Sequence, residues 1–142
     1  MAGDKQVDQR PFATPDVAAA FDAFPGSVRV RLLEVRNLIF SVAEDTPQVD
    51  ALSECLKWGQ PSYLTIETKS GTTIRLGIDK ARGCAAFYVH CQTSLIDQYR
   101  SLFPESFEFS GNRALLLDRE SLPEAELRHC IKLALTYHRP TG

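Results

Sequence analysis

The sequence predicts an α+β domain whose helices pack mainly on one face of an antiparallel sheet. Three observations lead to this fold class. Apolar residues recur at helical spacing in the first third of the chain and again near its C-terminus. The middle third instead alternates apolar and polar residues, as half-buried strands do. The predicted order is helices, three strands, a helix, two strands and a helix, and such grouping favours an antiparallel sheet.

The composition indicates one compact domain. A chain of 142 residues can bury about two thirds of the surface that it exposes when unfolded. Sixteen basic and eighteen acidic residues leave a net charge of -2 without long runs of either sign, which disfavours binding to nucleic acid or to a membrane. The chain start lacks the apolar core of a secretory signal, and no segment has the length of a membrane span. We therefore expect a cytoplasmic protein whose four cysteines, with no C-x-x-C pair, stay reduced.

The N-terminal region is predicted to begin with a tail and continue with a helix. Residues 1–14 show no periodicity and are expected to be mobile, so that a single domain spans residues 15–139. Thr14 is a good N-cap and Pro15 suits a first helical turn. The first helix is therefore expected from Pro15 to about Phe24.

Two further helices are predicted before the first strand. Ser27 is the expected cap of the longer one, and its buried face consists of apolar residues three and four positions apart. These residues are Val28, Leu32, Val35, Ile39 and Val42. The charged residues expected on its solvent side are Arg29, Arg31, Glu34 and Arg36. A short third helix is expected from Pro47 to Cys55.

A three-strand meander is predicted next. Its strands are residues 63–68, 72–78 and 84–90, each with an alternating pattern. A three-residue turn would join the first two strands and place Ile66 opposite Ile74.

The C-terminal part is predicted to contain two helices and a hairpin. A helix is expected over residues 94–102 and a hairpin over residues 107–118. Ser121 and Glu124 have the spacing of a capping box, and the helix that they start should reach about Tyr137.

A chain reversal is predicted at Gly59 and Pro61, where the helical third of the chain meets the strands. Next to it lies Trp58, the only tryptophan. Two interpretations stay open. Trp58 anchors the reversal in the core, or Lys57, Trp58 and Tyr63 form the lip of a ligand pocket.

Several of these features together resemble the YdhG-like family, a set of small bacterial domains largely without assigned function. The most specific one is the K-W-G-x-P-x-Y pattern of residues 57–63. The others are the segments 28–33, 87–89 and 131–134. The resemblance covers roughly residues 18–137 and implies the fold rather than a reaction. One branch of the family is labelled a frataxin-like iron chaperone, which implies delivery of iron, but no short iron motif accompanies that label.

The sheet face opposite the core is the candidate binding site. The predicted register gathers polar side chains there: Tyr63, Thr65, Glu67, Thr73, Arg75, Tyr88 and His90. With Lys57 and Trp58 at its edge, this face would suit an anionic or planar small molecule, since Arg75 offers a planar set of donors. The same pattern also fits an ordinary solvated face or a protein-binding surface, such as that of a homodimer.

An acidic loop is the candidate metal site. Glu44, Asp45, Asp50 and Glu54 gather between the second and third predicted helices. Their oxygens could bind Fe(II) loosely, as an iron chaperone that must release its cargo requires. A solvated acidic loop explains the same residues.

No enzyme class is predicted. Neighbours on a strand point to opposite faces, so His90 and Cys91 should not act together as base and nucleophile. The chain also lacks a phosphate loop, a Rossmann fingerprint and the H-E-x-x-H and G-x-S-x-G motifs. We expect a non-enzymatic domain that binds an unidentified small molecule or protein and needs no cofactor. An iron chaperone is the alternative.

Overall fold

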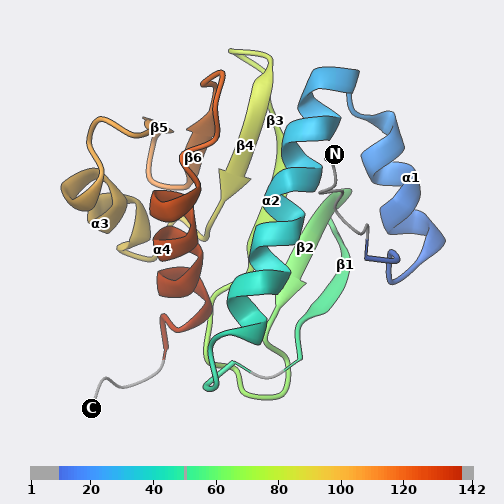
Figure 1. Ribbon diagram of the computed structural model, residues 1–142, viewed down its shortest axis with the longest axis horizontal. Helices are drawn as coiled ribbons and strands as arrows, with labels where there is room; N and C mark the ends of the chain where they lie inside the picture. The colour runs from blue at the N-terminus through green and yellow to red at the C-terminus, as the bar shows by residue number, and fades with distance from the viewer. Residues whose placement is uncertain (1–9, 50, 139–142) are drawn as a thin grey trace, which may run out of the picture.

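The computed structural model describes residues 10–49 and 51–138, which form four helices and one six-stranded antiparallel sheet (Figure 1). The predicted α+β fold class is confirmed. The helices are α1 (Pro15–Ala23), α2 (Gly26–Glu44), α3 (Leu95–Leu102) and α4 (Glu124–Leu135). The strands are β1 (Ser53–Lys57), β2 (Gln60–Leu64), β3 (Ile74–Asp79), β4 (Cys84–Tyr88), β5 (Glu108–Ser110) and β6 (Ala114–Leu117). Their order in the sheet is β1-β2-β3-β4-β6-β5.

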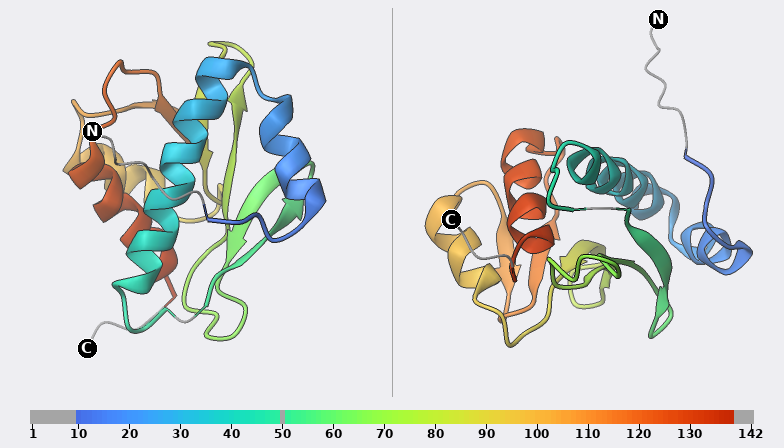
Figure 2. Two further views of the ribbon diagram at one scale, coloured as in Figure 1. Left: turned by 45° about the vertical axis from the view of Figure 1, so that its right-hand side comes forward. Right: turned by 90° about the horizontal axis from the view of Figure 1, so that it is seen from below.

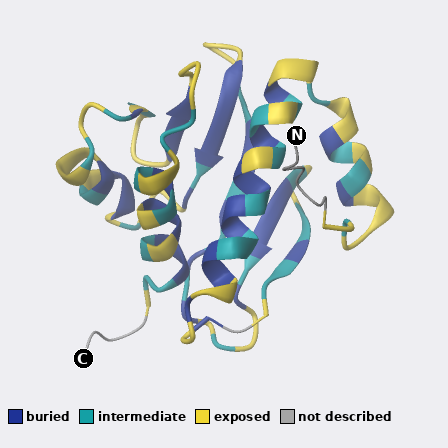
Figure 3. Ribbon diagram, in the orientation of Figure 1, coloured by how far each residue is buried: buried dark blue, intermediate teal, exposed yellow. Residues whose placement is uncertain are grey.

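The main core lies between the sheet and the helices on one of its faces. Helices α2 and α4 contact each other, α2 crosses β3 and β4, and α1 covers β1 and β2 (Figure 2). The predicted inner face of α2 is buried, and it meets a sheet face that contains Ile74, Leu76 and Phe87 (Figure 3). None of the helices formed by the described residues covers the other face of the sheet.

Helix starts agree only partly with the predicted caps. Thr14 caps α1 as expected, because its hydroxyl accepts a hydrogen bond from the Val17 N–H at 3.2 Å. Helix α2 begins after Pro25, and the expected Ser27 cap is not formed. Helix α4 begins after Pro123 without a side-chain cap, so the capping box predicted from Ser121 is also wrong.

The segment from Arg10 to Thr14 is packed against the domain, which corrects the predicted mobile tail for these residues. The Arg36 guanidinium donates hydrogen bonds to the Arg10 carbonyl at 2.8 Å and to the Pro11 carbonyl at 3.1 Å. The Phe12 ring stacks on that of Phe21 at 5.4 Å between centroids. Residues 1–9 of the predicted tail lie outside the described residues.

The third helix predicted from Pro47 to Cys55 is wrong. Strand β1 occupies the end of this segment and continues beyond it, so that β1 to β4 form a four-strand meander. The apolar residues at positions 49, 52 and 56 have the spacing of a helix face. In the structure Glu54 and Leu56 face the core and Cys55 faces away from it, which is the two-residue period of a strand.

The connection from β2 to β3 is longer than predicted. Residues 65–73 form a loop instead of continuing the strands around a three-residue turn. The loop docks on the C-terminal end of α4, where the Thr72 N–H donates to the Ala134 carbonyl at 3.0 Å and the Ser70 hydroxyl donates to the Leu135 carbonyl at 2.9 Å. This docking fixes the end of the loop that enters β3.

Candidate functional site

The β1–β2 hairpin places Trp58 on the surface. Lys57 pairs with Gln60, so only Trp58 and Gly59 form the loop. Their φ angles are +56° and +76°, as the two central residues of a type I′ turn require. The Trp58 side chain is 89% exposed, so the interpretation that anchors it in the core is wrong.

The polar sheet face exists, although its membership differs from the prediction. Arg75 lies directly opposite Tyr88 in the β3–β4 pair, so both side chains project from the face away from the main core, as predicted. Tyr63 does not join them, because it lies opposite Ile74 and is buried on the core side. The predicted partner of Ile74 was Ile66, and a shift by three residues, an odd number, moves a side chain to the other face.

Two other predicted members of this face also lie elsewhere. Thr65 is buried in the loop after β2, where its hydroxyl accepts a hydrogen bond from the Gly71 N–H at 3.0 Å. Glu67 is exposed in the same loop. Neither belongs to a strand, so the alternation argument does not apply to them.

A hollow of about 300 Å³, here the Trp58 hollow, lies at one end of the polar face. Four of the predicted binding residues line it: Lys57, Trp58, Arg75 and His90. Thr73, which the predicted register also placed on this face, lines it as well, and three residues that were not assigned to the site complete the lining: Thr72, Cys91 and Arg113. The structure thus brings the β1–β2 hairpin together with the starts of β3 and β6 and the segment after β4.

The Trp58 hollow is cationic. Lys57, Arg75 and Arg113 contribute positive charges, and no carboxylate occurs among the described residues that line it. No ion pair between described residues involves any of these three side chains. The chain as a whole has a net charge of -2, so this local excess of positive charge does not follow from the composition.

A second hollow of about 420 Å³, here the Tyr88 hollow, adjoins the first. Arg75 and Arg113 line both hollows. We call the two together the arginine cleft. The further lining residues of the Tyr88 hollow are Gln60, Ile78, Asp79, Lys80, Ala81 and Tyr88. The Tyr88 hollow therefore also has three cations, Arg75, Lys80 and Arg113, but adds one carboxylate, a carboxamide and a phenol.

The lack of a Cβ atom at Gly77 leaves room for the side chains of Gln60 and Tyr88 in the Tyr88 hollow. A Cβ atom at this position would come within 2.5 Å of Gln60 Nε2 and 3.3 Å of Tyr88 Cε2. The Tyr88 hydroxyl donates to the Ile78 carbonyl at 3.2 Å, which holds the ring along the strand. Burial, and next the negative charge of Asp79, raise the pKa of Tyr88, so its phenol remains a donor.

His90 and Cys91 lie beyond the end of β4 and line the same hollow. Strand geometry therefore does not separate His90 from Cys91, contrary to the prediction. His90 Nδ1 accepts a hydrogen bond from the Gln92 N–H at 3.0 Å. In a neutral ring this assignment leaves the proton on Nε2, which can donate to a ligand.

Three of the four predicted metal ligands pair with separate arginines. Glu44 pairs with Arg10, and Asp45 pairs with Arg128 at 3.1 Å. The Glu54 side chain is only 2% exposed and pairs with Arg36 at 2.5 Å. Asp50 lies outside the described residues. Within residues 10–49 and 51–138 no three His, Cys, Asp or Glu side chains form a group that could hold a metal ion.

The Arg36–Glu54 pair is a structural site that sequence reasoning missed. Arg36 is fully buried although its charge predicted a solvent position, and Glu54 accepts further hydrogen bonds from the Ala13 N–H at 3.0 Å and the Tyr63 hydroxyl at 2.8 Å. Burial by itself would raise the pKa of Glu54, but the hydrogen bonds from Arg36, Ala13 and Tyr63 outweigh it and lower that pKa. Burial and then the Glu54 charge raise the pKa of Tyr63, which therefore stays a donor.

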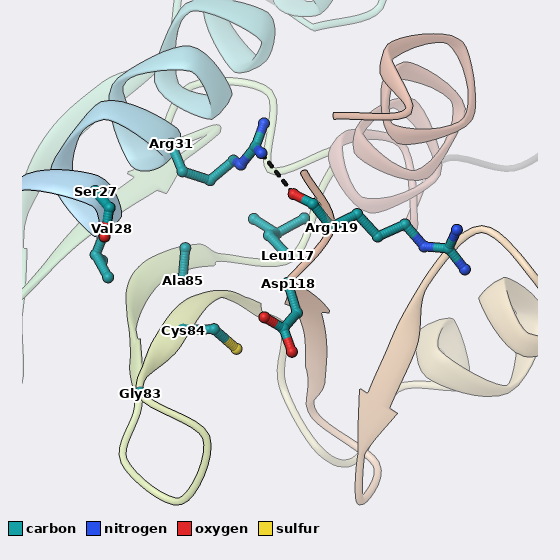
Figure 4. A pocket seen from close by; sticks show the side chains of 9 residues that line it. All are labelled: Ser27, Val28, Arg31, Gly83, Cys84, Ala85, Leu117, Asp118 and Arg119. Carbon is teal, nitrogen blue, oxygen red and sulfur yellow. Dashed lines mark hydrogen bonds between the residues drawn. The ribbon is translucent and has the colours of Figure 1, made fainter. Parts of the chain in front are cut away.

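A smaller hollow of about 200 Å³ lies between the N-terminal end of α2 and the ends of β4 and β6 (Figure 4). Of the two arginines that line it, Arg31 already donates to the carbonyls of Arg119 and Glu120 at 2.7 and 2.9 Å, and Arg119 donates to the Glu105 carbonyl. Burial, and next the charge of Asp118, raise the pKa of Cys84, which keeps this thiol protonated. This hollow therefore offers less for ligand recognition than the arginine cleft.

The fold and the site define an α+β domain with a cationic cleft on the sheet face that none of the four described helices covers. Comparisons with protein-family models, with curated proteins and with solved structures give no match for this chain. The resemblance to YdhG-like domains thus stays an expectation from the sequence. In the described part of the chain, no helix combines the length and the apolar character needed to cross a membrane.

Proposed function

We propose that this chain is a YdhG-like, non-enzymatic binding domain whose arginine cleft takes a small organic anion. The observation that carries the proposal is the convergence of Lys57, Arg75 and Arg113 on one hollow without a carboxylate among its described lining residues. Arginine fits carboxylate and phosphate oxygens in a planar, multidentate manner. An anion in the cleft would supply the partner that these side chains lack in the described part of the chain.

Partial burial of Arg75 strengthens this argument. Its side chain is half-buried, so the cation loses part of its hydration without an ion pair to another described residue. A bound anion would offset that loss. Charged hydrogen bonds of this kind contribute about 1.5–3 kcal/mol each.

Trp58 supports a ligand with a planar part. A large aromatic side chain at the tip of a hairpin gains little from the fold, since only a small part of it is covered. At the rim of the Trp58 hollow it offers a face on which a planar ring can stack. A ligand that combines a planar group with an anion is a nucleotide-like molecule or an aromatic acid.

Fluorescence of the single tryptophan tests the proposal directly. Titration with adenosine 5′-monophosphate should change the Trp58 emission in a saturable manner, and the change should weaken as salt is added. Adenosine has the same ring without the phosphate and should give no saturable change. Fe(II) in the same titration tests the iron alternative.

Two variants with the same change of charge locate the site. Arg113→Gln should lower the affinity for the monophosphate about 10- to 100-fold, the equivalent of one or two lost charged hydrogen bonds. Arg128→Gln removes an equal charge from α4, on the helical side of the domain, and should leave the affinity unchanged. Equal losses in both variants, or no anion response in the wild-type protein, would refute the proposal.

A further inference from the structure

We infer that the ligand of the arginine cleft is an organic diphosphate with an aromatic ring at one end and a hydroxylated group at the other. The inference rests on the proposed function and adds the chemical class of the ligand. Its starting point is the shared lining of the two hollows, because Arg75 and Arg113 border both of them. An anionic group bound by the two arginines would have one hollow on each side.

The charges of the cleft fit a diphosphate better than a single anion. Arg75 on β3 and Ala114 on β6 both lie directly opposite Tyr88 on β4. Arg75 and the start of β6 are therefore two strand spacings apart, about 10 Å. Two guanidinium groups that approach from such separate strands can each take a pair of oxygens. A diphosphate offers enough oxygens for both, and its charge of about −2 to −3 near neutral pH matches the three cations of the Trp58 hollow.

The Trp58 hollow suits the aromatic end of this ligand. Trp58 offers an exposed ring face, and His90 offers a ring whose Nε2 proton remains available for a hydrogen bond. The hydroxyl of Thr73 adds a donor and an acceptor within the same hollow. Polar groups at the edge of a heteroaromatic ring could therefore be recognised there.

The Tyr88 hollow suits a hydroxylated end instead of a further anion. Lys80 adds one positive charge to this hollow, but the Asp79 carboxylate offsets it and accepts hydrogen bonds from hydroxyls. The Gln60 carboxamide, which lies over Gly77, can both donate and accept. From Arg75 to Asp79 the strand advances about 13 Å, which leaves room for a sugar-sized group beside the phosphates.

Isothermal titration calorimetry with three probes of increasing length tests the inference. The probes are adenosine 5′-monophosphate, adenosine 5′-diphosphate and adenosine 5′-diphosphoribose. The diphosphate should bind about tenfold more tightly than the monophosphate, and the diphosphoribose about tenfold more tightly than the diphosphate. Diphosphoribose that binds no better than the diphosphate would overturn the inference and leave the proposed function intact, whereas no binding by any probe would overturn both.

Substitutions of Asp79 test whether the gain in affinity from the diphosphate to the diphosphoribose arises in the Tyr88 hollow. Asp79→Ala should remove most of the advantage of the diphosphoribose and leave the affinity for the diphosphate unchanged. Asp79→Asn keeps a side-chain oxygen acceptor and should retain part of it. Asp97→Ala on α3, outside the cleft, is the matched control. Circular dichroism verifies that each variant is folded, and an advantage that survives in Asp79→Ala would contradict the inference.

Discussion

Two arginine environments in this domain differ in almost every respect. Arg36 is fully buried, and its guanidinium donates to both carboxylate oxygens of Glu54 and to two backbone carbonyls of the N-terminal segment. It also lies 4.4 Å from the centre of the Phe12 ring. Arg75 and Arg113 line an open cleft and have no ion-pair partner among the described residues.

The contrast separates a structural arginine from those available for binding. Removal of one partner from a buried pair leaves an uncompensated charge in a poorly solvated place, and this costs much more free energy than loss of an exposed side chain. Arg36 joins α2, β1 and the N-terminal segment, so the fold depends on it. Among residues 10–49 and 51–138 no ion pair holds Arg75 or Arg113, which leaves both available to a ligand.

Replacement of each arginine by methionine gives the largest expected difference. Arg36→Met should lower the free energy of unfolding by about 3–5 kcal/mol, since Glu54 stays buried without its cation. Arg75→Met should change it by less than about 0.5 kcal/mol, as is usual for surface positions. Urea unfolding followed by circular dichroism measures both. Similar losses for the two variants would show that the arginines do not differ as the structure indicates.

The pH dependence of stability sharpens the same contrast. Because folding lowers the pKa of Glu54, its ionised form stabilises the fold above the ordinary value of 4.5, and this contribution is lost as the pH falls through the folded-state pKa. Urea unfolding between about pH 6 and about pH 3 should therefore show a difference between wild type and Glu54→Gln that shrinks on acidification. Glu44→Gln, at an exposed pair with Arg10, should show little such change. A difference for Glu54→Gln that stays constant with pH would contradict the assignment.

Gly71 and Gly77 differ in how much room each has for an added Cβ atom. A Cβ on Gly71 would lie 2.6 Å from the Cα atom of Leu135, whose backbone cannot move aside, and we expect Gly71→Ala to cost about 1–3 kcal/mol. A Cβ on Gly77 meets mainly the end of the flexible Gln60 side chain. Gly77→Ala should therefore cost less than about 1 kcal/mol while displacing Gln60 within the Tyr88 hollow. Thermal unfolding compares the two variants, and a larger loss for Gly77→Ala would reverse this interpretation.

The polar face could be predicted where the strands pair through a short connection. Alternation along β3 and β4 placed Arg75 and Tyr88 on the side away from the main core, and their direct pairing agrees with it. These two strands follow each other across a short turn, so local pattern suffices. Tyr63 was misplaced because the β2–β3 loop is long, and its length cannot be read from alternation.

Other members of the two sites depend on contacts between distant parts of the chain. Arg113 lines the same hollows as Arg75 only because β6, which follows α3 and β5, pairs with β4. Arg36 lies four residues after Leu32 and three before Ile39, at the border of the buried face of α2. Its charge predicted solvent exposure, and the partner that permits its burial, Glu54, lies in a segment with the apolar spacing of a helix.

Substitution of Trp58 should have the smallest effect on stability and should distinguish most clearly between a role in stability and a role in binding. Its backbone has a φ of +56°, a left-handed conformation that costs most residues free energy and that asparagine tolerates well. Trp58→Asn should therefore stabilise the hairpin by up to about 1 kcal/mol, because little burial is lost with the ring. In calorimetry the same variant should bind adenosine 5′-diphosphate at least tenfold more weakly, since the stacking face is gone. Trp58→Phe keeps that face and should retain most of the affinity. If Trp58 lowers stability and is nevertheless needed for affinity, its role is in binding. Unchanged affinity in Trp58→Asn would show that Trp58 does not contact the ligand and that the cations of the cleft bind it without stacking.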